Sequence, residues 1–236
     1  IFGRQPDTAW LNRKAAQGLI SMDSNFNSMF QQNFEQRLTL SAQLEPVRDL
    51  AITINMSKSF SKNYSEVFRF IDTTGGANRN FLHLNPYSNG SFDITYIAFK
   101  TLFGKFNPNQ VSETFKTFES NRIILSKRLG IVNPNSGTQG ADGYYYGYGK
   151  YAVDVLIPSF IAAYTGQDPE KVSLIKQNNA NIRSNPFSGL MPLPNWKLDY
   201  TGLSRIPAFS KIFTSFNISH GYNCNLSMNG FTSALL

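Results

Sequence analysis

Cysteine, histidine and charge are all scarce in this chain of 236 residues. It has one Cys, two His and 16% charged residues, whereas an ordinary soluble domain is about 25% charged. A single cysteine excludes a disulfide scaffold and a cysteine-rich zinc site. Two histidines leave little material for a histidine-based metal centre. We therefore expect no metal and no other cofactor.

Long apolar runs are also missing. A transmembrane helix needs about 18 or more consecutive apolar residues, and the nearest candidate, Ala152 to Tyr164, is shorter and contains Asp154 and Pro158. The chain opens at Ile1 without a start methionine or a signal peptide and stops at Leu236 in an apolar stretch. We expect it to be a piece of a larger protein.

The charge balance is basic, with 22 Lys and Arg against 15 Asp and Glu, a formal net charge of +7. Aromatic residues make up 14% of the chain, which excludes a disordered basic tail. The basic residues are scattered along the sequence rather than clustered in one stripe, so we expect no nucleic-acid partner.

Alternation with a period of two predicts several strands. It runs over residues 34–45 and 50–61, with a turn at 46–49, and continues less cleanly over 64–71. Further strands begin at Phe92 and near Trp196, and the longest pattern covers 216–229. Residues 72–90, with Gly75-Gly76 and Asn89-Gly90, predict a loop.

The polar side of these strands carries mostly Ser, Thr, Asn and Gln, where a soluble sheet usually carries Lys and Glu. Two-sided segments of about ten residues are typical of an outer-membrane β-barrel; an antiparallel sheet of a soluble protein is the alternative. Residues predicted to face a barrel lumen are Thr53, Asn55, Ser57, Asn217, Ser219, Asn223 and Asn225. Residues predicted to face lipid are Leu38, Leu40, Ile52, Ile54, Ile218, Tyr222 and Leu226.

Two short turns expose a gap in this strand count. The turn at 46–49 and that at 204–211 look alike, with a proline and basic residues, and short turns lie on the periplasmic side of a barrel. Two turns on the same side of a membrane need an even number of strand crossings between them. The sequence predicts three strands between these turns, beginning at Leu50, at Phe92 and near Trp196. Either 64–71 crosses separately, or a strand is hidden before residue 194, or one turn is extracellular.

A helical region interrupts the strands. Asn107-Pro108 predicts a helix start, five apolar residues follow at helical spacing, and Gly130 predicts its end. A Gly/Tyr tract at 140–149, an apolar segment over 153–164 and a short helix near Asp168-Pro169 come next. The tract reads either as a flexible spacer or as an ordered loop; we favour order, because it leads straight into the apolar segment.

No catalytic constellation is present in the sequence. His83 is predicted in a loop and His220 on the apolar side of a strand. Cys224 lies four residues after His220, about 13 Å along an extended strand, too far for a Cys–His dyad. We expect no enzymatic activity; an enzyme would need a compact polar cluster around His83 or His220.

Several stretches resemble one known family. They are Tyr148-Gly149, 154–158, Phe160, 162–164 and Gly166, together with 2–7, 44–46, 49–50, 194–196, Tyr200, Gly202, Leu203 and 219–222. Taken in their order along the chain, these stretches resemble the SprA/Sov family, the giant outer-membrane translocon of the Bacteroidetes type IX secretion system. The chain departs from the family at Ala152-Val153, where Ser-Gln is expected, and at 223–225, where Arg-Ser-Thr is expected.

The resemblance implies a fragment of a single-chain transmembrane β-barrel of the largest class, with 36 strands, of which five or six crossings fit here. It implies passive conduction of folded cargo proteins across the bacterial outer membrane, for secretion and gliding motility. The implied partners are a PorV-like outer-membrane barrel protein, a periplasmic plug protein, secreted cargo and membrane lipid.

The expected organisation has four parts: a loop and short helix over 1–33, barrel strands over 34–103, a helical insertion over 104–194 and barrel strands over 195–236. The insertion would be a cap, a lumen constriction or plug-like element, or a docking surface. Its candidate residues are Tyr148, Gly149, Asp154, Leu156, Ile157, Pro158, Phe160 and Tyr164. The alternative function is a soluble or surface-exposed β-rich binding module that uses the Gly/Tyr loop as its contact surface.

Overall fold

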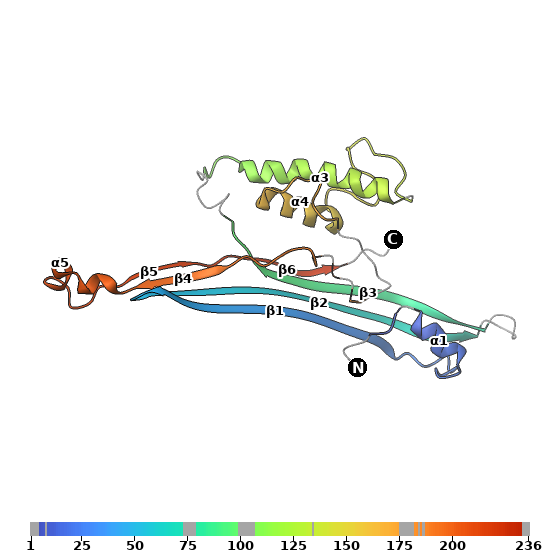
Figure 1. Cartoon of the computed structure of the whole chain (residues 1–236). Helices are drawn as coiled ribbons and strands as arrows, with labels where there is room; N and C mark the ends of the chain where they lie inside the picture. The colour runs from blue at the N-terminus through green and yellow to red at the C-terminus, as the bar shows by residue number, and fades with distance from the viewer. Residues whose placement is uncertain are drawn as a thin grey trace.

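The computed structural model of the chain describes residues 5–7, 9–72, 79–98, 107–133, 135–174, 182–183, 185 and 187–232. A long curved sheet forms one layer, and two helices lie over one of its faces (Figure 1). The strands are β1 Met29–Val47, β2 Leu50–Asp72, β3 Arg79–Thr95, β4 Asn195–Tyr200, β5 Ile218–Tyr222 and β6 Asn225–Thr232. The helices are α1 Trp10–Ala16, α3 Glu113–Val132, α4 Val153–Thr165, the 3-10 turn η1 Gly202–Arg205 and the single-turn α5 Pro207–Ser210.

The six strands form four antiparallel rows. β1 pairs with one edge of β2 along most of its length. β3 and β4 share the other edge of β2, β3 from Lys58 to Asp72 and β4 from Leu50 to Asn55. β5 pairs with β4 and β6 with β3. The first row is β1 and the second is β2. The third row is β3 followed by β4, and the fourth is β5 followed by β6. The fold is mainly β.

The third row is one strand that the insertion interrupts. β3 ends at Thr95 and β4 begins at Asn195 on the same edge of β2, so residues 96–194 leave and rejoin a single row. The buried Thr95 hydroxyl bridges the break: it accepts a bond from the Ser57 N–H at 3.1 Å and donates to the Ser57 carbonyl at 3.3 Å. The Leu193 N–H donates to the Thr95 carbonyl at 2.9 Å. We call this junction the seam.

The fourth row is broken at the same place, between β5 and β6. Cys224 donates its N–H to the Asn195 side chain at 3.0 Å, and its carbonyl accepts from the Tyr96 N–H at 2.9 Å. The pattern over 216–229 was predicted as one strand; it forms two collinear strands, because the chain changes partner from β4 to β3 at the seam.

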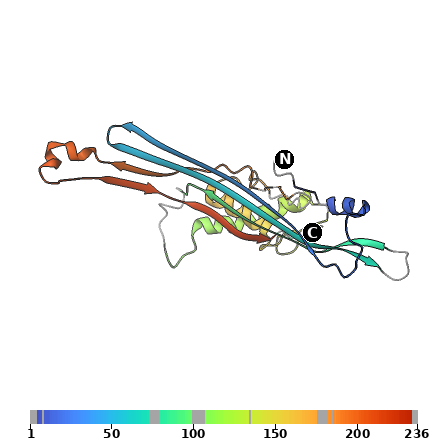
Figure 2. The ribbon, with the colours of Figure 1, turned by 90° about the horizontal axis from the view of Figure 1, so that it is seen from below.

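The four rows resolve the strand count. Residues 64–71 continue β2, and β3 with β4 makes one row, so two rows separate the turns at 46–49 and 204–211. Both turns lie at the same end of the sheet (Figure 2). Arg205 donates to Asp49 across them at 2.6 Å, and the Thr201 N–H donates to the Asp49 carbonyl at 3.0 Å. The second turn is larger than predicted, since it contains η1 and α5.

The predicted loop over 72–90 is wrong for most of its length, because β3 begins at Arg79. Asn85, with a φ of 49°, and Pro86 occupy an irregularity in the β2–β3 register, which absorbs two turn-forming residues within a strand. Gly75-Gly76 lies outside the described residues.

The helix boundaries also differ from the prediction. α3 begins at Glu113, where the Ser112 hydroxyl caps it by accepting from the Phe115 N–H at 3.1 Å, while Asn107 starts a turn. α3 passes Gly130 and ends at Val132. Asp168-Pro169 forms a turn instead of a helix. No helix in the described part of the chain is long and apolar enough to cross a membrane.

Candidate functional site

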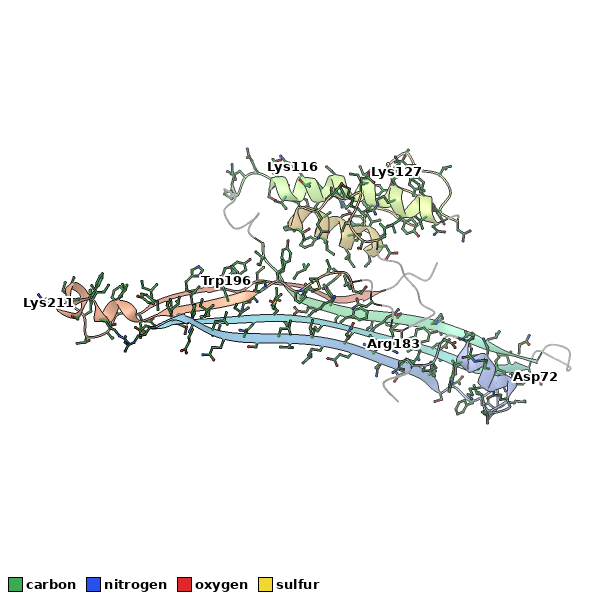
Figure 3. The ribbon with its side chains drawn as sticks, in the orientation of Figure 1. Asp72, Lys116, Lys127, Arg183, Trp196 and Lys211 are labelled. Carbon is green, nitrogen blue, oxygen red and sulfur yellow. The ribbon has the colours of Figure 1, made fainter. Side chains whose placement is uncertain are left out.

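The strand register separates two faces of the sheet. Thr53, Asn55, Ser57, Ser219 and Asn225 alternate with Ile52, Ile54, Ile218, Tyr222 and Leu226, and the paired positions of neighbouring rows agree. We call these the polar face and the apolar face, and side chains project from both (Figure 3). Within the strands, the residues predicted to face a lumen share the polar face and those predicted to face lipid share the apolar face, which Leu38 and Leu40 join through their pairing with Lys58 and Met56.

The polar face is bound together by uncharged side chains. The Ser41 hydroxyl donates to the side-chain Oδ1 of Asn55 at 2.9 Å, and the hydroxyls of Ser61 and Ser91 share a bond of 2.7 Å. At the seam, the Asn195 amide donates to Asn223 at 2.8 Å and to Asn225 at 3.3 Å. Asn217 directly precedes β5 and is exposed. This face offers water many weak hydrogen-bonding groups, and it also carries the ion pairs Arg37–Glu35 at 3.1 Å and Lys197–Asp199 at 2.8 Å.

The apolar face has two halves. The bare half comprises residues 38–47 of β1, 50–57 of β2, β4 and β5. Its aliphatic side chains stay open to solvent at Leu38, Leu40, Leu44, Val47 and Ile218. Two stacked rings, Trp196 and Tyr222, lie where the bare half meets the seam, with their centroids 4.6 Å apart. Nothing among the described residues packs over its centre.

The covered half lies on the other side of the seam. Here Phe60 of β2, Phe92 of β3 and Phe187 of the insertion are buried together, the rings of Phe92 and Phe187 stacked 4.2 Å apart. Ile157 and Ile161 of α4 complete this core. Leu226, predicted to face lipid, packs against the same cluster on its own apolar face, so the insertion occupies the place that lipid was expected to take there.

A lysine fixes the insertion to the sheet. The Lys58 ammonium donates to the carbonyls of Phe187 at 2.8 Å, Ser188 at 3.0 Å and Leu190 at 2.7 Å. Three converging carbonyls satisfy all three donors of an ammonium group. Lys58 therefore marks where the covered half begins.

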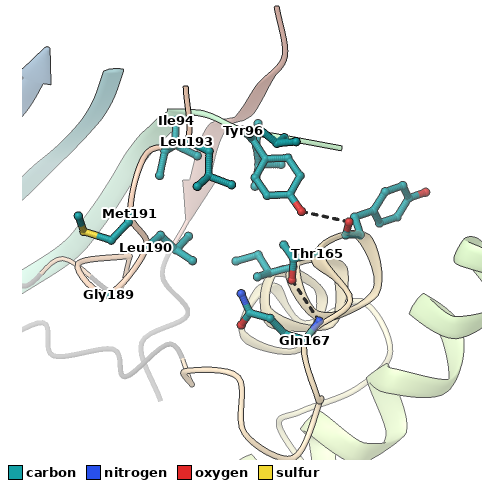
Figure 4. A pocket seen from close by; sticks show the side chains of 12 residues that line it. Ile94, Tyr96, Thr165, Gln167, Gly189, Leu190, Met191 and Leu193 are labelled. Atoms are coloured by element: carbon teal, nitrogen blue, oxygen red, sulfur yellow. Dashed lines mark hydrogen bonds between the residues drawn. The ribbon is translucent and has the colours of Figure 1, made fainter. Parts of the chain in front are cut away.

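A cavity of about 580 Å³ remains between the sheet and the end of α4 (Figure 4). Ile94, Tyr96, Leu190, Met191 and Leu193 line its sheet side, and Thr165 and Gln167 its helix side. The Tyr96 hydroxyl crosses to the Tyr164 carbonyl at 3.1 Å. The insertion is thus joined to the sheet by a hydrogen bond beside incomplete packing.

The Gly/Tyr tract is an ordered loop on α3, as favoured from the sequence. The Ser126 hydroxyl donates to the Tyr148 carbonyl at 2.7 Å and accepts from the Tyr145 N–H at 2.9 Å. Gly130 lies against the Tyr145 ring so closely that a Cβ there would overlap it. Gly130 therefore provides room for the tract instead of ending the helix.

The eight insertion candidates divide between interior and surface. Ile157 and Pro158 are buried and hold the insertion together, which removes them from an outer docking surface. Tyr148, Asp154, Leu156, Phe160 and Tyr164 are half-buried, and Gly149 is exposed. The Tyr148 hydroxyl accepts from Asn133 at 3.0 Å, and Phe160 and Tyr164 stack at 4.1 Å. The exposed tyrosines are Tyr146 and Tyr151, at 79% and 72%.

A histidine paired with a buried carboxylate was missed by sequence reasoning. His83 is in β3, not in a loop, and its Nδ1 lies 2.7 Å from the Glu66 carboxylate. Phe68 packs on the imidazole at 4.7 Å. The prediction of a loop over 72–90 hid this pair; the alternation of β2 alone places Glu66 on the buried side.

His220 lies on the apolar face as predicted, over Trp196 with ring centroids 6.5 Å apart. Cys224 is a half-buried free thiol. Within the described part of the chain, no three His, Cys, Asp or Glu side chains come together as a metal site would require.

The tip of the sheet, residues 201–217, carries the second turn. Phe209 and Phe213 both pack on Phe216, with ring centroids 5.5 and 5.3 Å apart. Ser204 closes the base of the tip by bonding both the N–H and the carbonyl of Phe216 at 3.0 Å. Ile206, Ile212 and Phe213 nevertheless remain exposed.

Neither a protein-family model nor a curated protein sequence matches the chain.

Proposed function

We propose that this chain forms part of a protein-conducting β-barrel of the bacterial outer membrane, and that it is a segment of a translocon of the type IX secretion family which its motifs resemble. The observation that carries the proposal is the two-faced, four-row sheet. One face is lined with Ser, Thr and Asn along the rows, and the other has a bare aliphatic half bordered by stacked aromatic rings. Apolar-out, polar-in alternation with aromatic girdles is the pattern of such barrels.

The open edges of the sheet support the same proposal. Among the described residues, the outer edge of β1 and the outer edges of β5 and β6 have no partner strand. Long strands with unpaired edges invite further pairing, and closure into a barrel is the way in which membrane strands satisfy their backbone groups. The four rows would be four consecutive crossings of a larger barrel, fewer than the five or six counted from the sequence.

In this arrangement the polar face lines the lumen. Thr53, Asn55, Ser57 and their neighbours hydrate a passage without binding one cargo strongly. Conduction through such a lumen is passive and requires no catalytic group in the chain. Secretion and gliding motility would follow from the cargo that passes.

The insertion then lies outside the lumen. It covers the apolar face beyond Lys58, so in the proposed barrel it would stand on the outer wall, beyond the lipid-facing half. A lumen plug or constriction is incompatible with that face, which leaves an outer cap or a docking surface. Its exposed tyrosines, Tyr146 and Tyr151, would be available to a PorV-like barrel protein, while a periplasmic plug protein would act at another place.

Photocrosslinking in secreting cells tests the proposal. A crosslinking amino acid at Asn55 would trap secreted cargo in transit, whereas the same group at Ile54, the next residue on the opposite face, would trap lipid and no cargo. The two positions share a strand and differ only in face. Capture of cargo from Ile54 and not from Asn55, or from neither, would overturn the assignment of the lumen.

The exposed tyrosines also favour a second candidate, the β-rich binding module. The Lys150 ammonium lies over the Tyr151 ring, 4.9 Å from its centroid. An exposed aromatic ring beside a cation is typical of a protein-binding surface. Fractionation separates the two candidates: a binding module would be found in the soluble fraction or washed from membranes with carbonate. A translocon segment would remain in the membrane in a band far above 26.5 kDa.

A further inference from the structure

We propose that the tip is an interfacial membrane anchor, which inserts Ile206, Ile212 and Phe213 among the headgroups of an anionic phospholipid surface. The inference deepens the proposed function and rests on it for the orientation of the sheet. It assigns a ligand, a lipid surface, to a turn that barrel closure does not require to be apolar.

The tip is built to hold apolar side chains outward. Its backbone is closed by consecutive bonds, among them Phe213 N–H to the Phe209 carbonyl at 2.8 Å and Ile206 N–H to the Leu203 carbonyl at 3.1 Å. The aromatic cluster of Phe209, Phe213 and Phe216 packs beneath them. Ile212 remains 76% and Phe213 43% exposed. An ordered turn with large exposed apolar side chains marks an interaction surface.

The charge around these side chains selects the partner. Residues 201–217 contain Arg205 and Lys211 and no acidic residue. Arg48 lies exposed in the adjoining turn, and the nearby Asp49 is already paired with Arg205 at 2.6 Å. With Arg205 and Asp49 paired, Arg48 and Lys211 are the cations beside the apolar side chains, and this combination suits anionic headgroups above an acyl layer.

The position of the tip gives a second reason, which rests on the proposed barrel. The bare half includes residues 38–47 of β1, which extend about 33 Å at about 3.3 Å per residue. With the strand tilt of about 40° usual in barrels, this length spans about 25 Å of membrane, the height of the apolar band. The tip continues the bare half directly beyond Tyr200 and Ile218, so its apolar side chains would lie at the level of the headgroups.

The test uses the full chain reconstituted in vesicles of phosphatidylethanolamine and phosphatidylglycerol. A fluorescent probe is attached at single cysteines in a Cys224→Ser background: Ile212→Cys and Phe213→Cys at the tip, with Thr214→Cys, an exposed polar neighbour, as the matched control. Ile212 and Thr214 are exposed and lie outside the aromatic cluster, so their substitutions leave its packing intact, whereas Phe213→Cys also removes the ring that packs on Phe216. A quencher carried on the lipid should reduce the signal at 212 and 213 several-fold more than at 214.

A probe at Leu40→Cys, in the bare half, separates this inference from the proposed function. Lipid quenching at 40 with water exposure at 212 and 213 would keep the barrel and overturn the anchor. Lipid quenching at 212 and 213 with water exposure at 40 would keep the anchor and overturn the barrel. Probes at 212 and 213 shielded from both water and lipid would mean that a protein covers the tip, which also overturns the lipid anchor.

Discussion

On the apolar face Phe92 is 1% exposed, whereas Leu44, on the same face beyond the seam, is 48% exposed. Both belong to the same period-two alternation and both are apolar. The covered half buries Phe60 and Phe92 with Phe187, while the bare half is aliphatic along β1 and β2 and carries the rings of Trp196, His220 and Tyr222 along β4 and β5. The alternation therefore determines which face a side chain takes, and the insertion determines whether that side chain is covered.

Truncation in the covered half should have the largest effect. Phe92→Ala removes a fully buried ring from the core between sheet and insertion, and should cost about 3–5 kcal/mol of unfolding free energy. Leu44→Ala, the matched change in the bare half, should cost less than about 1 kcal/mol, since Leu44 is half-exposed. Chemical denaturation of the two variants measures both losses of unfolding free energy. Equal losses would show that the two halves do not differ in packing.

A charge in the bare half should act only in the membrane. Leu40→Arg should cost about 2–4 kcal/mol of membrane assembly if it lies near the bilayer midplane. Ser41→Arg, one residue on and exposed on the polar face, should assemble almost normally. Heat-modifiable mobility of the outer-membrane protein on gels reports assembly. If both variants assemble alike, lipid does not touch the bare half.

A methyl group on α3 should loosen the Gly/Tyr tract without touching the sheet. Gly130→Ala places a Cβ against the Tyr145 ring, and overpacking of this kind should cost about 1–3 kcal/mol. Gly149→Ala is the control, since nothing lies within 4 Å of its Cβ position. Proteolysis within 139–150 should accelerate in Gly130→Ala only; protection in both would mean that the tract is held elsewhere.

Loss of the Lys58 ammonium should weaken the attachment of the insertion at the seam, at a smaller cost in stability than the changes above. Lys58→Met removes three bonds to backbone carbonyls, two of which are part-buried, at about 1–2 kcal/mol after allowance for solvent screening. Lys197→Met removes an exposed ion pair with Asp199 and should be close to neutral. Hydrogen exchange of residues 187–190 should rise in Lys58→Met, and an unchanged rate would show that ring packing alone suffices.

The two faces could be predicted because side-chain alternation is a local property: Ile52, Thr53 and Ile54 take their faces from the pleat alone. The third row could not, because Thr95 and Asn195 become neighbours through their common partner β2, a pairing that no local pattern contains. β3 was mistaken for a loop since Gly75-Gly76 and Asn89-Gly90 signal turns, yet Asn89 and Gly90 pair with Asn63 and Lys62 within the sheet, which is a tertiary effect. The start of α3 was misplaced because Asn107-Pro108 matches a helix start, whereas the cap of the helix is Ser112.

The seam also bears on how this part of the molecule can change in size. Residues 96–194 leave and re-enter the sheet at adjacent points joined by the Leu193–Thr95 bond. The entropy of closing such a loop rises only with the logarithm of its length, by about 0.6 kcal/mol for each doubling. The insertion can therefore lengthen, shorten or be exchanged for another element while every strand keeps its register. The insertion and the sheet are free to diverge independently.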